Sequence, residues 1–322
     1  MTTAPSAEDT HGASGHRDLT WVVALAASLW GTSALLREPL SAAADAATIV
    51  LYEHLVLVLV LLPWLPAALR AWAASPARVR AAAVLIGGGS SALATTLFTA
   101  AFRLGDPITP QILQKLQPLI AILLAGVLLG ERLRPRFLWF ALPALVGAWL
   151  MTFADPLDVR VGDLQAAALA LGAAALWAGG TVFGRMVDEH VGPRRTLVLR
   201  FAFGLPAAGL IVLLTGAPAT LPLALAPQLV LLALIPGAAA LSLYYVGLRR
   251  TAASRATLAE LMFPVTAAVI GVVFLDATLT ASRWLGALLV VAAVTALALH
   301  EARSRHTGVV VPAGPTAGVT GS

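Results

Sequence analysis

Long apolar stretches, separated by short groups of charged residues, prolines and glycines, run through almost the whole chain. An α-helix needs about 20 mainly apolar residues to cross the hydrocarbon core of a membrane. Most of the stretches are apolar around the whole helical circumference, which is typical of helices surrounded by lipid. They predict ten membrane spans, at residues 19–36, 48–69, 81–102, 107–129, 137–153, 164–184, 196–215, 228–248, 256–275 and 284–300. The expected fold class is an all-α integral membrane protein.

The composition supports this class and argues against several others. Only 11% of the 322 residues are charged, whereas a soluble domain carries about 25%. The absence of cysteine excludes disulfides and thiolate metal sites, and the six histidines form no His-Glu-x-x-His pair. The arginines lie in short groups rather than in the basic stripe of a nucleic-acid-binding protein. We therefore expect no metal, no cofactor, no catalytic residue and no nucleic acid partner.

The arginines between the predicted spans indicate an orientation. With the N-terminus in the cytoplasm, the segments on that side hold 15 arginines, and the opposite segments hold Arg37, Arg103, Arg160 and Arg283. Cytoplasmic loops carry the excess of basic residues, so we expect a multi-pass protein of the cytoplasmic membrane with both termini cytoplasmic. The polar residues 1–18 lack signal-peptide features, and they and residues 301–322 are expected to be disordered ends.

The two halves of the chain resemble each other at a shift of 146 or 147 residues. Leu29-Trp30 then falls on Leu176-Trp177, and Leu97-Phe98 falls on Leu243-Tyr244. Each half holds five predicted spans, an odd number, so the second half enters the membrane from the opposite side. The expected architecture is two inverted five-helix repeats, at 19–153 and 164–300, joined by an external linker at 154–163. Secondary transporters commonly use inverted repeats and bind substrate between them near the membrane midplane.

Two predicted spans carry a polar helical face that lipid would not solvate. In the fourth span the residues at i, i+3, i+4 and i+7 are Gln111, Gln114, Lys115 and Pro118. The ninth span repeats the pattern with Thr257, Glu260 and Pro264, the prolines marking expected helix breaks. One interpretation is that both faces line a substrate-binding translocation pocket. The alternative is a hydrogen-bond network that only holds the bundle together. Lys115 itself either contacts the substrate or forms a salt bridge with Glu53 or Glu260.

Other polar and aromatic residues inside the spans are further candidates, because buried ionisable groups in membranes pair or line cavities. Glu260 is either a proton carrier or a permanently ionised partner of Lys115. Glu53, beside His54, is a candidate outer gate or counter-ion, and Arg200 is expected to reach the lipid headgroups. The aromatic candidates, which stack on substrate or pack in the core, are Trp30, Trp177, Tyr244 and Tyr245.

Three short motifs resemble the EamA type of the drug/metabolite transporter superfamily. The first is Leu29-Trp30-Gly31-Thr32-Ser33, and the second is Pro118 followed by Leu129-Gly130-Glu131-Arg132-Leu133. The third is Phe203-Gly204 after Arg200-Phe201, which is similar to the Arg-Phe start of an even-positioned span in the family. The resemblance covers residues 19–300 and implies a ten-helix carrier with a central cavity, often exporting metabolites. Two positions depart from the family: Glu53 stands where an arginine is more usual, and Leu275-Asp276-Ala277 replaces Leu-Gly-Glu. The charge of the substrate is therefore not inherited from relatives.

These observations predict a secondary transporter that moves a small metabolite or drug by alternating access, with export favoured by the resemblance. A pocket containing both lysine and glutamate suits an amino acid or a related zwitterion. Coupling to protons and assembly as a homodimer are left open. The alternative function is an intramembrane enzyme acting on a lipid or isoprenoid, although no paired acids lie near one interface.

Overall fold

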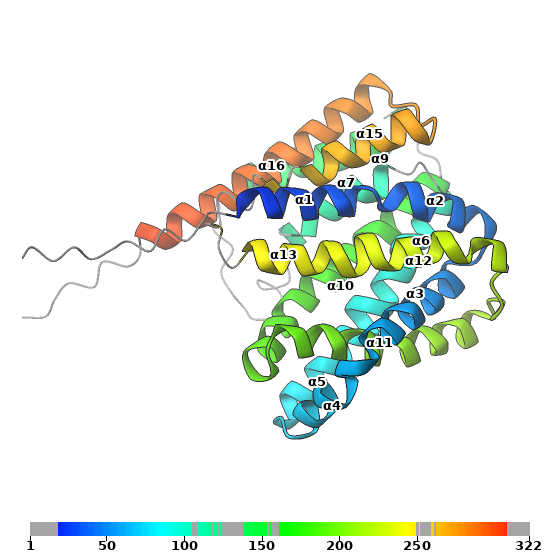
Figure 1. Cartoon of the computed structure of the whole chain (residues 1–322). Helices are drawn as coiled ribbons and strands as arrows, with labels where there is room; N and C mark the ends of the chain where they lie inside the picture. The colour runs from blue at the N-terminus through cyan, green and yellow to red at the C-terminus, as the bar shows by residue number, and fades with distance from the viewer. Residues whose placement is uncertain are drawn as a thin grey trace, which may run out of the picture.

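The computed structural model describes residues 19–104, 108–117, 119–120, 123, 138–152, 155, 161–248, 251, 259–260 and 262–307. Within these residues the regular structure is helical throughout. The helices form a bundle in which the first and last described helices begin and end at the same end of the molecule (Figure 1). Parts of all ten predicted spans are present, which confirms the all-α membrane fold class.

The first repeat is built from five successive segments. These are α1 (Thr20–Gly31) with α2 (Ser33–Ala43); α3 (Ala46–Leu61) with η1 (Leu62–Trp64) and α4 (Leu65–Ala73); α5 (Ala77–Leu85) with η2 (Ile86–Leu93) and α6 (Ala94–Leu104); α7 (Thr109–Leu113) with η3 (Gln114–Leu116); and α9 (Leu138–Thr152). The prediction that the first span ends at residue 36 is wrong, because α2 continues to Ala43 and includes Arg37.

The second repeat follows the same order. Its segments are α10 (Val161–Val191); α11 (Pro193–Thr215); η5 (Leu223–Leu225) with α12 (Ala226–Leu232), η6 (Ala233–Ala239) and α13 (Ala240–Leu248); α15 (Met262–Phe274); and α16 (Ala281–Thr307). Because α16 continues past residue 300, the expectation of disorder is wrong for residues 301–307. Polar residues can extend a membrane helix into water without breaking it, so the loss of apolar character at residue 300 did not mark a helix end.

Several of the described helices are long and apolar enough to cross a membrane. Five have at least 18 residues: Ala46–Ala73, Ala77–Leu104, Val161–Val191, Pro193–Thr215 and Leu223–Tyr244. Three shorter apolar helices are Leu138–Leu150, Met262–Phe274 and Ala281–Leu297. The first span is divided by a turn at Thr32 into two shorter helices. The molecule is therefore a multi-pass membrane protein.

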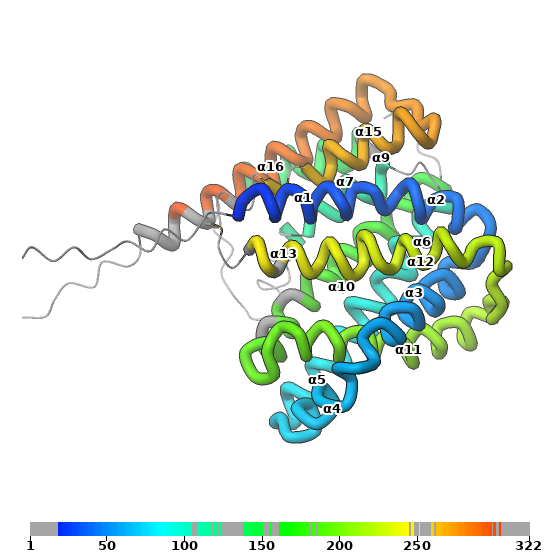
Figure 2. Tube along the Cα trace, in the orientation of Figure 1, coloured from blue at the N-terminus to red at the C-terminus, as the bar shows by residue number. Residues whose placement is uncertain are grey.

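The contacts between the two repeats follow the two-fold relation that the sequence predicts. α1 packs between α13 and α15 of the second repeat, as the tube trace also shows (Figure 2). In the corresponding way, α10 packs against α6 and α7 of the first repeat. The pairs α3 with α11 and α9 with α16 join equivalent spans. Exchanging the halves therefore reproduces these contacts.

The third and eighth spans each contain a π-helical segment at equivalent positions. η2 begins at Ile86 and η6 begins at Ala233, which is the repeat shift of 147 residues. Glycines in η2 allow close packing, since a Cβ on Gly87 would lie 2.6 Å from the Phe203 Cβ of α11. In η6, Pro236 lacks the N–H that a regular α-helix requires. Such interruptions in α-helices occur frequently at functional sites.

One end of α15 explains a departure from the family motif. Asp276 has a φ of 49°, in the left-handed region that favours glycine, and it stands where the family motif has glycine. The Ala277 N–H donates to the Gly271 carbonyl at 2.9 Å, which closes the last turn as in a left-handed helix cap. Aspartate is among the residues that tolerate this conformation best after glycine, so the cap is retained without the motif.

Candidate functional site

Two aromatic pairs join the repeats across their interface. Trp30 of α1 meets Tyr244 of α13 with ring centroids 4.9 Å apart. Trp177 of α10 meets Phe98 of α6 at 5.2 Å. The repeat shift exchanges these pairs, because Trp30 corresponds to Trp177 and Phe98 corresponds to Tyr244. Three of the predicted aromatic residues therefore lie at the repeat interface, whereas the side chain of Tyr245 lies outside the described residues.

A polar group adjoins the first aromatic pair. The Tyr244 hydroxyl donates to Glu260 Oε1 at 2.7 Å. Lys115 places its Nζ 4.2 Å from the ring centroid of Phe263, a cation–π contact. Glu260 attracts the Lys115 ammonium electrostatically, but among the described residues no carboxylate oxygen lies within the 4.0 Å of a direct ion pair with it. Lysine, glutamate and tyrosine therefore gather on one side of the interface.

Gln111 and Gln114, two further residues of the predicted polar faces, are among the described residues. Gln111 is fully buried, and its Oε1 accepts a hydrogen bond from the Ser33 hydroxyl at 3.4 Å. Gln114 is half-buried in η3. Pro118 and Thr257 lie outside the described residues. Gln111 is thus tied to the first span of the same repeat.

Pro264 lies directly beyond a turn in the ninth span. The chain turns at Glu260, four residues before Pro264. A proline removes the N–H that would donate to the carbonyl four residues earlier. The Glu260 carbonyl instead accepts a hydrogen bond from the Phe263 N–H at 3.1 Å. This turn places the Glu260 side chain within reach of Tyr244.

Sequence reasoning missed Arg37, which it placed outside the membrane. The side chain is buried, and its Nη2 lies 3.1 Å from both carboxylate oxygens of Glu53. Its Nη1 donates to the Thr99 hydroxyl at 2.5 Å, and its guanidinium carbon lies 6.0 Å from the ring centroid of Phe98. A charge is tolerated in such a place only when a countercharge and hydrogen bonds compensate it. Glu53 is therefore the counter-ion of Arg37, not of Lys115.

A helical pattern in the sequence could have revealed this residue. Trp30, Ser33 and Arg37 lie at i, i+3 and i+7, which is one face of a nearly continuous helix. In the structure these three side chains contact Tyr244, Gln111 and Glu53 respectively. The first span therefore presents one face to the whole candidate site. In the sequence alone, the arginine only marks the end of an apolar run.

His54 occupies a separate environment. Its Nδ1 lies 2.8 Å from the Val50 carbonyl and its Nε2 lies 2.9 Å from the Ser91 hydroxyl. A carbonyl only accepts hydrogen bonds, so the Nδ1 carries a proton. Gly204 packs on the ring so closely that a Cβ there would lie 2.5 Å from His54 Cδ2. The structure therefore places His54 in helix packing, where its two ring nitrogens bond to Val50 and Ser91 rather than to the Glu53 carboxylate.

Arg200 also differs from expectation. Its Nη2 donates to the Ser90 carbonyl in η2 at 3.0 Å, so its reach to lipid headgroups is not observed. The Ser90 hydroxyl in turn donates to the Leu176 carbonyl at 2.7 Å. The π-helical segment thus contacts both α11 and α10 through polar groups. These contacts lie beside the Trp177 end of the repeat interface.

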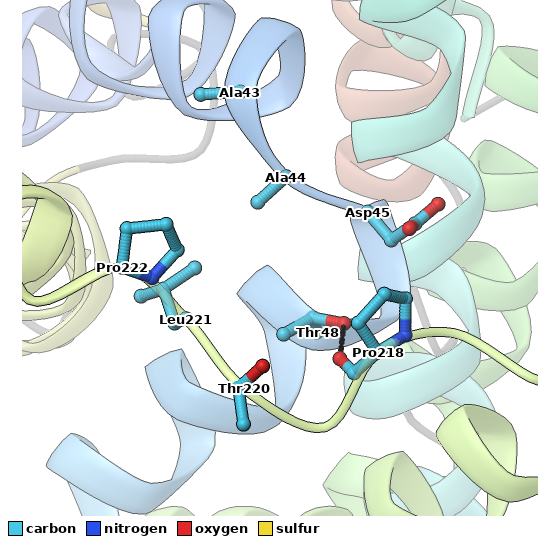
Figure 3. Close-up of a pocket in the computed structure, with 8 residues that line it drawn as sticks. All are labelled: Ala43, Ala44, Asp45, Thr48, Pro218, Thr220, Leu221 and Pro222. Atoms are coloured by element: carbon cyan, nitrogen blue, oxygen red, sulfur yellow. Dashed lines mark hydrogen bonds between the residues drawn. The ribbon is translucent and has the colours of Figure 1, made fainter.

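A cavity of about 380 Å³ lies beside the turn that joins α2 to α3 (Figure 3). This turn is at the opposite end of the bundle from the start of α1 and the end of α16 (Figure 1). It lies between the turn joining α2 to α3 and the segment that follows α11, and Ala43, Asp45, Pro218 and Leu221 are among its lining residues. The Thr48 hydroxyl donates to the Pro218 carbonyl at 2.6 Å and holds the two sides together. Among the described residues, no three His, Asp or Glu side chains gather as a metal site requires.

Comparisons with known proteins place this arrangement in a family. Residues 19–153 and 164–299 each match the EamA-like transporter family. The riboflavin transporter ImpX of Fusobacterium nucleatum is 33% identical over 193 residues, covering 58% of this chain and 64% of that protein. The uncharacterized transporter YwfM of Bacillus subtilis is 33% identical over 192 residues, covering 59% of this chain and 63% of that protein. The match thus spans less than two thirds of either relative.

A solved structure titled "Crystal structure of protein" shares the fold. It superposes with a TM-score of 0.58 at 22% identity, covering 89% of this chain and 98% of that one. The likeness therefore extends over both repeats. Since the family match covers each repeat almost completely, the chain belongs to the EamA-like transporter family.

Proposed function

We propose that this protein is a secondary transporter that moves a small organic solute between the two repeats by alternating access. The observation that carries the proposal is the pair of exchanged aromatic contacts, Trp30 with Tyr244 and Trp177 with Phe98. Each contact spans the interface between the repeats, where transporters of this architecture bind substrate. A relative rocking of the repeats would open and close these contacts in turn.

The proposed substrate is a planar heteroaromatic metabolite. Four aromatic side chains at the interface offer faces for stacking, and Gln111 and Glu260 offer hydrogen bonds. The F. nucleatum relative is named a riboflavin transporter, and riboflavin has a planar heteroaromatic ring. An amino acid or related zwitterion is the second candidate, because Lys115 and Glu260 supply opposite charges within electrostatic range.

We propose Glu260 as the group that couples transport to protons. It accepts a hydrogen bond from Tyr244 and lies near Lys115 without a direct ion pair. The ionised carboxylate therefore has the lysine as a countercharge, and the protonated carboxyl group keeps the tyrosine as a hydrogen-bond partner. Export across the cytoplasmic membrane, with both termini cytoplasmic, is the proposed direction. The arginine asymmetry between loops supports this orientation.

Flux into proteoliposomes tests the proposal. Purified protein is reconstituted, and uptake of labelled riboflavin and labelled amino acids is followed with and without a pH gradient. Lys115→Ala is expected to abolish flux of the transported solute, whereas Arg103→Gln, at an exposed pair outside the site, is expected to leave it unchanged. Unchanged flux in Lys115→Ala at equal reconstitution would contradict the assignment of the site.

A second experiment separates coupling from binding. If Glu260 carries the proton, Glu260→Gln is expected to retain exchange of labelled for unlabelled solute while losing acceleration by a pH gradient. Loss of exchange as well would show that Glu260 binds the solute instead.

Conversion of a lipid or isoprenoid by the detergent-solubilised protein, without a gradient, would support the alternative intramembrane enzyme.

A further inference from the structure

We infer that the end of the bundle formed by α4, α5 and the start of α11 is a binding site for the headgroup of an anionic phospholipid. The three helices pack against one another. Together they carry five exposed arginines: Arg70, Arg78, Arg80, Arg194 and Arg195. We call this set the arginine cluster.

The arginine cluster has little compensation from the protein itself. Among the described residues, no carboxylate oxygen lies within 4.0 Å of these guanidinium groups. The acids on the neighbouring helix are Asp188 and Glu189, at the end of α10. Five positive charges against two negative ones leave an excess that attracts an external anion.

The positions of the arginines within their helices strengthen this conclusion. Helix N-termini carry partial positive charge, which favours acidic side chains and disfavours basic ones. The first turns of α5 and α11 contain no acidic residue, and Arg78, Arg80, Arg194 and Arg195 stand there instead. The electrostatics of the helices alone therefore do not account for these charges, but an anion bound between them would.

The surroundings of the cluster favour a lipid over a soluble anion. The Arg194 guanidinium lies over the Trp64 ring at 5.5 Å, and the Trp72 Nε1 donates to the Arg80 carbonyl at 3.1 Å. Tryptophan is enriched at the level of lipid headgroups. Leu62 and Leu85 beside the cluster are 50% and 54% exposed, so acyl chains have apolar surface to contact. Guanidinium groups bind phosphate oxygens through paired hydrogen bonds, which a phosphodiester headgroup provides.

Native mass spectrometry of the full chain in detergent tests the inference. The protein is titrated with phosphatidylglycerol and, separately, with phosphatidylcholine of the same acyl chains. Phosphatidylglycerol is expected to bind more tightly, and Arg194→Gln/Arg195→Gln is expected to weaken it about 25-fold, or about fivefold for each arginine removed. The control Arg103→Gln is expected to bind it as the wild type does.

Three results would overturn the inference. The first is equal affinity for the two lipids, and the second is undiminished phosphatidylglycerol binding by Arg194→Gln/Arg195→Gln. The third is complete displacement of the lipid by millimolar inorganic phosphate, which would identify a site for a free anion. Unchanged binding of phosphatidylcholine by the double variant shows that it remains folded, so that a selective loss supports the lipid site.

Discussion

The buried ion pair between Arg37 and Glu53 leads to a quantitative prediction about stability. Their side chains are only 6% and 9% exposed, so neither charge is solvated by water. Removing one member of such a pair strands the other charge, which costs about 3–5 kcal/mol. Loss of an ordinary hydrogen bond, such as that to Thr99, costs about 1 kcal/mol. Glu53→Gln and Arg37→Gln are therefore each expected to lower the free energy of unfolding by about 3–5 kcal/mol.

The double variant distinguishes an ion pair from two independent contributions. Arg37→Gln/Glu53→Gln leaves no unpaired charge, so its loss of stability is expected to be well below the sum of the single losses. The assay is equilibrium unfolding of purified protein in mixed micelles with increasing denaturing detergent. A loss of stability in the double variant equal to the sum of the two single losses would refute the reasoning.

An exposed pair in the same chain provides a matched control. Asp45 and Arg103 are 3.0 Å apart, against 3.1 Å for the buried pair, but their side chains are 44% and 47% exposed. Exposed ion pairs contribute about 0–1 kcal/mol, because water and salt screen them. Asp45→Asn is therefore expected to change the unfolding free energy by less than about 1 kcal/mol. Equal losses of unfolding free energy in Asp45→Asn and Glu53→Gln would show that burial does not determine how much an ion pair contributes to stability.

Two further substitutions test the packing of the site. A Cβ on Gly31 would lie 2.7 Å from a side chain of α15, so Gly31→Ala is expected to destabilise the protein by about 1–3 kcal/mol. Gly179→Ala has no neighbour within 4 Å and is expected to be neutral or stabilising; similar unfolding temperatures for both would contradict this packing. Ser91→Ala leaves the buried His54 Nε2 without its partner, an expected loss of about 1–3 kcal/mol. Thr215→Ala removes an exposed hydroxyl that donates to the Ile211 carbonyl of the same helix, and it serves as the control for Ser91→Ala in the same thermal unfolding measurement.

Hydropathy and internal similarity determined much of the fold. Each span is encoded by a continuous run of about 20 residues, so its existence can be read locally, and most predicted ends agree with the helices to within a few residues. The repeat shift also anticipated that Trp30 corresponds to Trp177. The error at Arg37 arose because a charged residue ends an apolar run in the sequence whether or not a partner neutralises it in space.

The tertiary structure alone decided which side chains meet. No local pattern indicates that the Trp30 ring contacts Tyr244, that Arg37 pairs with Glu53, or that the Lys115 ammonium lies over the Phe263 ring. These contacts depend on how helices distant in the chain approach one another, and small residues such as Gly31 set that approach. Hydrophobicity places a helix in the membrane but does not select its neighbours, because lipid and protein interiors are similarly apolar; close packing and buried polar pairs make that selection.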